Sequence, residues 1–203
     1  KKLLNNSKYS CNKENMSSSA IIFFWGINRE FKDLDLHNIL FSNNYKEEFK
    51  NIFEKNDLYH DPTIYINITS KDIKGVSPKG SENWFVMINS PKDTGQDWDK
   101  MKKKLRKNII KKIDKILKTN IESHIVEEKV FTPMDISANT NSYLGSLYGE
   151  SSNTIFSPIK RHQNFSKKIG NLYFCGGTVH PGGGIPLCIM SSKIVTDLIE
   201  KNN

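Results

Sequence analysis

Residues 171–186 read NLYFCGGTVHPGGGIP, and this stretch decides how the rest of the chain is interpreted. Its first five residues are mostly apolar and aromatic, which is typical of a strand. Glycine and proline then dominate as far as Pro186, and residues 187–201 have the apolar spacing of an amphipathic helix. The order of strand, glycine loop and helix predicts a turn whose backbone amides can approach an anionic ligand at a helix start.

The glycine spacing by itself leaves two interpretations open. The loop lacks the G-x-G-x-x-G spacing of dinucleotide-binding folds. A purely structural turn therefore explains the glycines as well as a phosphate-binding turn does. The rest of the chain has to decide between the two.

Upstream of this stretch, short apolar runs alternate with helical segments. Strands are expected at residues 20–27, 37–41, 63–69, 83–89 and 125–131. Helices are expected at residues 45–53 and 98–118, and Thr132 is suited to cap a short helix. Because the elements show no regular strand–helix–strand repeat, we expect an α/β fold of α+β character with a mixed or antiparallel sheet.

The net charge of +8 is concentrated in residues 98–118. This segment has ten lysine and arginine residues against two acids, Asp99 and Asp114, so it holds the whole excess. Its apolar residues recur every three or four positions, which predicts an amphipathic helix with one lysine-rich face. A solvated surface helix and a helix that docks on an anionic membrane both fit this pattern.

The composition argues against several other classes of protein. No segment has the run of about 18 apolar residues that a membrane-spanning helix needs, and the chain starts without a signal-peptide pattern. Only three of the 30 basic residues are arginine and no nucleic-acid-binding motif occurs, so we expect no nucleic-acid partner. The three cysteines lack metal-ligand spacing, so we expect neither a metal site nor a disulfide framework.

Four motifs occur in an order that points to one family. They are FTPMD at 131–135, GSLYG at 145–149, SPIKR at 157–161 and CGGTVHPGGGIP at 175–186. In this order they resemble the F-T-P-x-D, G-x-x-Y-G, P-x-x-R and flavin-loop elements of the bacterial carotenoid (phytoene) desaturases, which are amine-oxidase-like flavoproteins. Within that family, the CGGTVH string is most similar to the hydroxycarotenoid 3,4-desaturase branch.

The resemblance implies a domain organisation and the cofactor FAD. It covers the chain from about Ser17 onward. Members of the family begin with a G-x-G-x-x-G motif that grips the ADP half of FAD, and residues 1–203 contain no such motif. The chain therefore resembles the C-terminal portion of a desaturase. Residues 1–165 would belong to the substrate-binding domain, and residues 166–203 would contribute a strand, glycine loop and helix to a Rossmann-like FAD-binding domain.

The flavin loop of the family falls on ten residues of this chain. They are Gly176, Gly177, Thr178, His180, Pro181, Gly182, Gly183, Gly184, Ile185 and Pro186. The resemblance implies that Gly177 and Thr178 approach the pyrophosphate or ribityl chain, and that residues 181–185 lie against the isoalloxazine. The helix from Pro186 would direct its N-terminus at the anionic end of the flavin. His180 is either a base or a structural hydrogen-bonding residue, and no catalytic residue is assigned.

Several aromatic residues on the expected strands also have two interpretations. They either fill an ordinary core or line a tunnel for a polyene. The residues concerned are Phe23, Phe24, Trp25, Tyr65, Trp84 and Phe85. Cys175 and Cys188 are expected to be small core residues without redox chemistry.

The activity implied by the resemblance is the desaturation of a carotenoid. Flavin N5 would take a hydride and a base or solvent would take a proton, while the protein orients the hydrocarbon. The expected partners are a lipophilic carotenoid and a membrane surface, at the cytoplasmic inner face of the cell membrane, and the oligomeric state is left open. Two alternatives remain: a related flavin-dependent lipid oxidoreductase or isomerase, and a non-catalytic truncated fragment that binds a membrane or partner.

Overall fold

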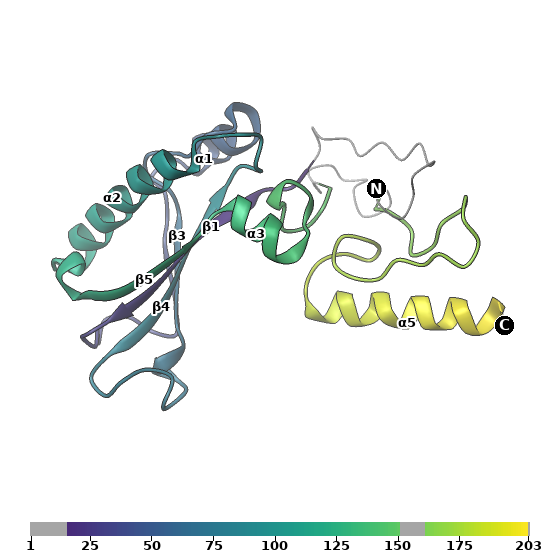
Figure 1. Cartoon of the computed structure of the whole chain (residues 1–203). Coiled ribbons are helices and arrows are strands. Elements are labelled where there is room, and N and C mark those ends of the chain that lie inside the picture. The colour runs from purple at the N-terminus through teal and green to yellow at the C-terminus, as the bar shows by residue number, and fades with distance from the viewer. Residues whose placement is uncertain (1–15, 151–160, 203) are drawn as a thin grey trace. The chain divides into compact units, whose positions relative to one another are not determined.

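A computed structural model of the chain describes residues 16–150 and 161–202 (Figure 1). The chain divides into two compact units. The first, which we call the sheet unit, comprises Ser18–Leu147, and the second, the loop–helix unit, comprises Tyr148–Asn203 together with Lys1–Ser17. The functional division expected at residues 165/166 lies downstream of this boundary and stays a prediction.

One five-stranded sheet organises the sheet unit (Figure 1). Its strands are β1 (Ser19–Ile27), β2 (His37–Leu40), β3 (Ile64–Ile68), β4 (Glu82–Ser90) and β5 (Ile125–Phe131). They lie in the order β2-β3-β4-β1-β5, and every pairing is antiparallel. The expected strands and the mixed helix-and-sheet class are confirmed, and the sheet is antiparallel throughout.

The two faces of the sheet differ because consecutive strand residues point to opposite sides. In β1, residues 21, 23, 25 and 27 are buried, and in β3 and β4 every second residue is buried as well. These side chains pack in one core with helix α2 (Trp98–Leu117) through its buried residues Leu105, Ile109 and Ile113. The core therefore lies between α2 and one face of the sheet, and the residues between the buried ones face the other way.

The sequence sets both ends of α2. The side chain of Asp97 accepts a hydrogen bond from the backbone N–H of Lys100 and so caps the first turn. At the other end Lys118 adopts a left-handed conformation with φ of 49°, which stops the helix. The helix expected at residues 98–118 is confirmed.

The shorter helices follow the sequence less closely. Helix α1 (Tyr45–Lys50) continues directly as a π-helical turn, η2 (Asn51–Lys55), so the helical segment expected at residues 45–53 is confirmed and its second half is π-helical. The side-chain amide of Asn51 donates to the carbonyl oxygen of Glu47 (2.7 Å) and competes with the helix backbone where the helix widens. Helix α3 (Pro133–Thr140) begins as expected, with Thr132 and Asp135 forming a capping box. The remaining turns are the 3₁₀ segments η3 (Thr69–Lys71), η4 (Ile121–His124) and η5 (Tyr143–Gly145).

The loop–helix unit contains helix α5 (Ile185–Asn202), which agrees with the helix expected over residues 187–201. The strand expected at residues 171–177 is wrong. The structure has one isolated bridge in this segment, between Tyr173 and Phe165, and a second one just after it, between Val179 and His162. A strand needs a neighbour to pair with over several residues. Within the described residues of this unit, only single residues come opposite this segment.

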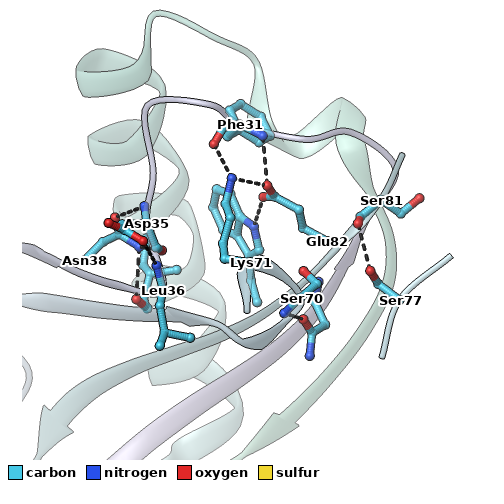
Figure 2. A network of polar contacts seen from close by, with 12 residues as sticks. Phe31, Asp35, Leu36, Asn38, Ser70, Lys71, Ser77, Ser81 and Glu82 are labelled. Atoms are coloured by element: carbon cyan, nitrogen blue, oxygen red, sulfur yellow. Dashed lines mark hydrogen bonds and ion pairs between the residues drawn. The ribbon is translucent and has the colours of Figure 1, made fainter. Parts of the chain in front are cut away.

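A buried carboxylate ties three segments of the sheet unit together (Figure 2). Glu82 at the start of β4 is 3% exposed, and its oxygens accept hydrogen bonds from the Phe31 backbone N–H (3.0 Å) and the Trp84 indole (2.7 Å). Lys71 pairs with the same carboxylate at 2.7 Å and donates to the Phe31 carbonyl oxygen at 2.6 Å. Each of these polar groups has a hydrogen-bond partner, so the buried Glu82 carboxylate is stable only while all of its partners are present.

We predict that Glu82→Ala lowers the free energy of unfolding of the sheet unit by about 3–5 kcal/mol, because it leaves the half-buried Lys71 ammonium without its counter-ion and the Phe31 N–H and Trp84 indole without an acceptor. All three tryptophans, Trp25, Trp84 and Trp98, lie in this unit, so their fluorescence during urea unfolding reports on it alone.

The matched control is Glu122→Ala. Glu122 also pairs with a basic residue, Arg106 at 2.6 Å, but its side chain is 59% exposed. A loss below about 1 kcal/mol is expected for such a pair. Equal losses for the two variants would show that the Glu82 set contributes no more than a surface ion pair.

Candidate functional site

The glycine loop (residues 176–186) packs closely against its own unit on one side. A Cβ on Gly183 would lie 2.6 Å from Cδ1 of Tyr148, and a Cβ on Gly177 would lie 3.2 Å from the Cα of Gly183. Gly182 lies against the guanidinium of Arg161, whose Nη1 also donates to the Gly177 carbonyl oxygen at 3.0 Å. Gly183 and Gly177 leave little or no room for a side chain, and at Gly182 the positive φ of 141° favours glycine.

Two buried polar side chains, which no local sequence pattern indicates, support the inner side of the loop. The side-chain amide of Asn164 donates to the carbonyl oxygens of Phe174 (3.1 Å) and His180 (2.8 Å). It also donates to Ser191 Oγ (2.9 Å), and that hydroxyl accepts a hydrogen bond from the Gly176 backbone N–H (3.1 Å). Asn164 is 4% exposed and Ser191 is fully buried, so this Asn164–Ser191 clamp connects both ends of the loop to the first turns of α5.

The opposite side of the loop is open. A Cβ built on Gly176 or Gly184 would meet no atom of residues 16–150 or 161–202 within 4 Å, and both glycines have positive φ, at 125° and 105°. Thr178, His180, Ile185 and Pro186 are exposed as well. The ten predicted residues therefore form one loop with a packed inner side and an open outer side, where the N-terminus of α5 is also exposed.

The reactive side chains near the loop make few contacts. His180 is anchored through its backbone, since its N–H donates to the His162 carbonyl oxygen at 3.0 Å, while its imidazole is exposed. Cys175 is exposed and its Sγ lies 3.3 Å from Ser192 Oγ, and Cys188 is half-buried, so neither is the core residue expected. In residues 16–150 and 161–202, no three His, Cys, Asp or Glu side chains gather as a metal site requires.

A second candidate surface lies on the sheet unit. The face of the sheet opposite α2 carries four aromatic rings in a row, which we call the aromatic band: Tyr65, Phe85, Phe24 and Phe131. Their centroids are 6.2 Å apart from β3 to β4, 5.5 Å from β4 to β1 and 5.4 Å from β1 to β5. These rings are partly exposed, with Phe24 at 38%.

The aromatic residues for which the sequence left two interpretations lie on two different faces of the sheet. Phe23, Trp25 and Trp84 are at most 2% exposed and belong to the core. Phe24, Tyr65 and Phe85 lie on the other face. Met87 lies opposite both Ile22 of β1 and Tyr65 of β3, so Met87 and Ile22 extend the apolar surface of this face. Strand alternation could have made this separation, because two neighbouring phenylalanines on a strand must face opposite sides.

The lysine-rich face of α2 is mostly unpaired. Lys102, Arg106 and Lys112 have carboxylate partners at 2.6–2.8 Å. Lys103, Lys107, Lys111 and Lys115 are exposed and have no ion-pair partner among the residues that the structure describes. No helix in the described part of the chain is both long and apolar enough to cross a membrane.

Two parts of the sequence analysis lie outside the described residues. They are the third cysteine, Cys11, and all of the SPIKR motif except Arg161.

No family model matches the chain. Its sequence is nevertheless similar to carotenoid desaturases over more than nine-tenths of the chain's length. The resemblance found in the motifs is confirmed.

The relatives include the branch that the CGGTVH string predicted. The chain is 57% identical to the 1-hydroxycarotenoid 3,4-desaturase of Flavobacterium sp. over 94% of its own length and 39% of the relative's. It is 32% identical to a 4,4'-diapophytoene desaturase of Staphylococcus aureus and 31% identical to the 4,4'-diaponeurosporene oxygenase of Staphylococcus haemolyticus. The chain spans about two-fifths of the length of these curated relatives.

We predict that Gly183→Ala destabilises the glycine loop by about 1–3 kcal/mol, because the new methyl group overlaps the Tyr148 ring. The measurement is hydrogen exchange at the Cys188 amide, which bonds to the Gly184 carbonyl oxygen in the first turn of α5. Exchange should become faster in proportion to the destabilisation.

A double-mutant cycle identifies the cause. Tyr148→Ala should restore most of the protection lost in Gly183→Ala, but none of that lost in Gly184→Ala, where only the positive φ is unfavourable. If Tyr148→Ala rescues neither variant, the ring does not limit the residue at position 183.

Proposed function

We propose that this protein acts as a FAD-dependent carotenoid desaturase, in which the sheet unit binds the polyene and the loop–helix unit contacts the flavin. The observation that carries the proposal is the 57% identity to a 1-hydroxycarotenoid 3,4-desaturase, which extends over both units. The two candidate surfaces support it, because each suits one of the two molecules that such a reaction brings together.

The aromatic band is the proposed contact surface for the carotenoid. A polyene is a long, flat, apolar molecule, and a row of rings across four strands offers it a continuous surface of matching character. Along β4 the apolar positions Phe85 and Met87 give way to Asn83, and Glu127 of β5 lies in the same row, across Gly26 of β1. The surface therefore becomes polar at one end, where the hydroxylated end of a 1-hydroxycarotenoid could be solvated.

The glycine loop is the proposed contact surface for the flavin. The residues fit such a group, because the outer side leaves open space at Gly176 and Gly184 next to an exposed helix start. Residues 176–178 would hold the phosphate-bearing part, and residues 181–186 would lie beside the ring system. Bound FAD would supply the two-electron acceptor that the removal of two hydrogens requires.

The chain itself contributes binding and shielding to this chemistry. The Asn164–Ser191 clamp and the packing of Gly183 on Tyr148 fix the path of the loop, so its outer side keeps one shape. The aromatic band holds the hydrocarbon and keeps water from it. Formation of a C=C bond also releases a proton, for which the exposed His180 imidazole and solvent are the candidates.

The chemistry of the substrate also suggests a location. A carotenoid dissolves in lipid, so we place the enzyme at the inner face of the cell membrane as a peripheral protein. The unpaired lysines of α2 support this placement, since each lysine close to an anionic surface adds about 1 kcal/mol of attraction.

The test is a chimera in which this chain replaces the aligned segment of the Flavobacterium 1-hydroxycarotenoid 3,4-desaturase. We predict that the chimera retains flavin and converts a 1-hydroxycarotenoid in detergent micelles into a product with one more conjugated double bond. The product is followed by its longer absorption wavelength and by a mass loss of two hydrogens. Gly184→Val in the chimera should remove the flavin while the protein stays soluble, because the side chain enters the open outer side of the loop.

The other functions have distinct outcomes. An isomerised product of unchanged mass would favour a flavin-dependent isomerase. A folded, flavin-containing chimera that leaves every carotenoid unchanged would favour a non-catalytic binding role. Normal flavin content in the Gly184→Val variant would make the loop purely structural.

The aromatic band is tested with a matched pair of variants in the same chimera. We predict that Phe24→Ala raises KM for the carotenoid several-fold, since Phe24 contacts the rings of both Phe85 and Phe131. Phe53→Ala is the control: Phe53 is equally exposed, at 36% against 38%, but lies in η2. Equal kinetics for the two variants would show that the polyene does not use this face.

A further inference from the structure

A surface hollow of the sheet unit lies between α2 and the loops on either side of α1 and η2. Its α2 wall includes Asn108, Lys111 and Lys115, and its loop wall includes Asn43 and His60. The hollow takes no part in the surfaces proposed for the polyene and the flavin. Its walls carry cations and amides, which are the groups that bind phosphate oxygens.

An ion pair fixes the floor of this hollow. Lys112 Nζ contacts Asp61 Oδ1 (2.7 Å) and also donates to the carbonyl oxygens of Phe41 and Pro62 (both 2.8 Å). Burial raises the pKa of Asp61, but the hydrogen bond from the Asn43 backbone N–H and the Lys112 ammonium outweigh it and hold the pKa below its ordinary value. Asp61 is therefore a neutralised anchor for Lys112, and it is not a free negative charge in the hollow.

Lys111 and Lys115 supply the charge that remains. They lie one helical turn apart on the same side of α2. Neither has an ion-pair partner in residues 16–150 or 161–202, and both are exposed. Asn43 and Asn108, each with a side-chain amide, line the same hollow. Two free cations beside two amides make a site with net positive charge and several donors.

Apolar side chains stand at the rim of the hollow. Phe41 is 68% exposed and Ile116 is 48% exposed, and both line it. Exposed side chains of this size are unfavourable in water and favourable in the acyl region below a headgroup. The combination of free cations and apolar rim therefore matches a phosphate that is attached to a hydrocarbon.

We propose that this hollow binds the phosphate of an anionic phospholipid headgroup, with Lys111 and Lys115 as its ligands and Phe41 and Ile116 inserted beside it. The inference rests on the proposed function only in that a lipid-soluble substrate brings the enzyme to a membrane. It differs from general attraction between lysines and a charged surface, because two particular lysines carry the binding.

The experiment compares two double variants of the chimera by flotation with phosphatidylcholine vesicles that contain phosphatidylglycerol. Lys111→Ala/Lys115→Ala removes the two lysines of the hollow. Lys103→Ala/Lys107→Ala removes two exposed lysines with the same spacing on the same helix. The hollow variant should lose about thirtyfold in partitioning, and the control variant much less. Phe41→Ser should also weaken binding, although the charge is unchanged.

Three results would overturn the inference. Equal losses for the two double variants would mean that the charge of α2 acts as a whole. Unchanged binding in the hollow variant would place the membrane contact elsewhere. Displacement of the parent chimera from vesicles by soluble glycerol phosphate, with Phe41→Ser unaffected, would assign the hollow to a free phosphate. Desaturation is measured separately, in detergent micelles. Loss of vesicle binding therefore leaves the proposed function intact, and loss of desaturation leaves the inferred phospholipid site intact.

Discussion

The alternation of buried and outward residues in β1 and β4 is the constraint on which the sheet unit depends. These two strands have neighbours on both sides, and α2 covers one of their faces. A shift of the register by a single residue would exchange the core residues with the aromatic band. The same register that buries Trp25 and Trp84 therefore aligns Phe24 with Phe85 on the opposite face.

The loop–helix unit is held together in a different way. It contains no paired strand among its described residues, and α5 leaves Ile185, Ile189 and Met190 exposed, so apolar burial within the unit is small. Buried amide and hydroxyl groups replace it, with Asn164 and Ser191 satisfying the backbone of the loop. A loop that is fixed by polar contacts from below can keep its outer side free.

The sequence predicted the elements that local patterns specify. Spacing of three and four residues located α2, alternation located the strands, and the Thr132–Asp135 pair located α3. The motifs identified the family and the glycine loop. Local patterns could not reveal the clamp, because Asn164 and Ser191 are 27 positions apart and meet only through the fold. The strand predicted at residues 171–177 is wrong for a different reason. Its residues have strand character, but a strand also needs a neighbouring strand to pair with, and local patterns do not predict that neighbour.

The position of β1 has a consequence for the synthesis of the chain. β1 comes first in the described sequence, yet its partners are β4 and β5, so Ile22 must wait for Met87 and then for Phe131. Contacts of such long range form slowly. On the ribosome, the apolar run from Ala20 to Ile27 therefore emerges long before β4 and β5 can pair with it, and until then it is prone to pair with other chains. This strand, which lies between β4 and β5 in the finished sheet, is the segment of the sheet unit that most needs a chaperone.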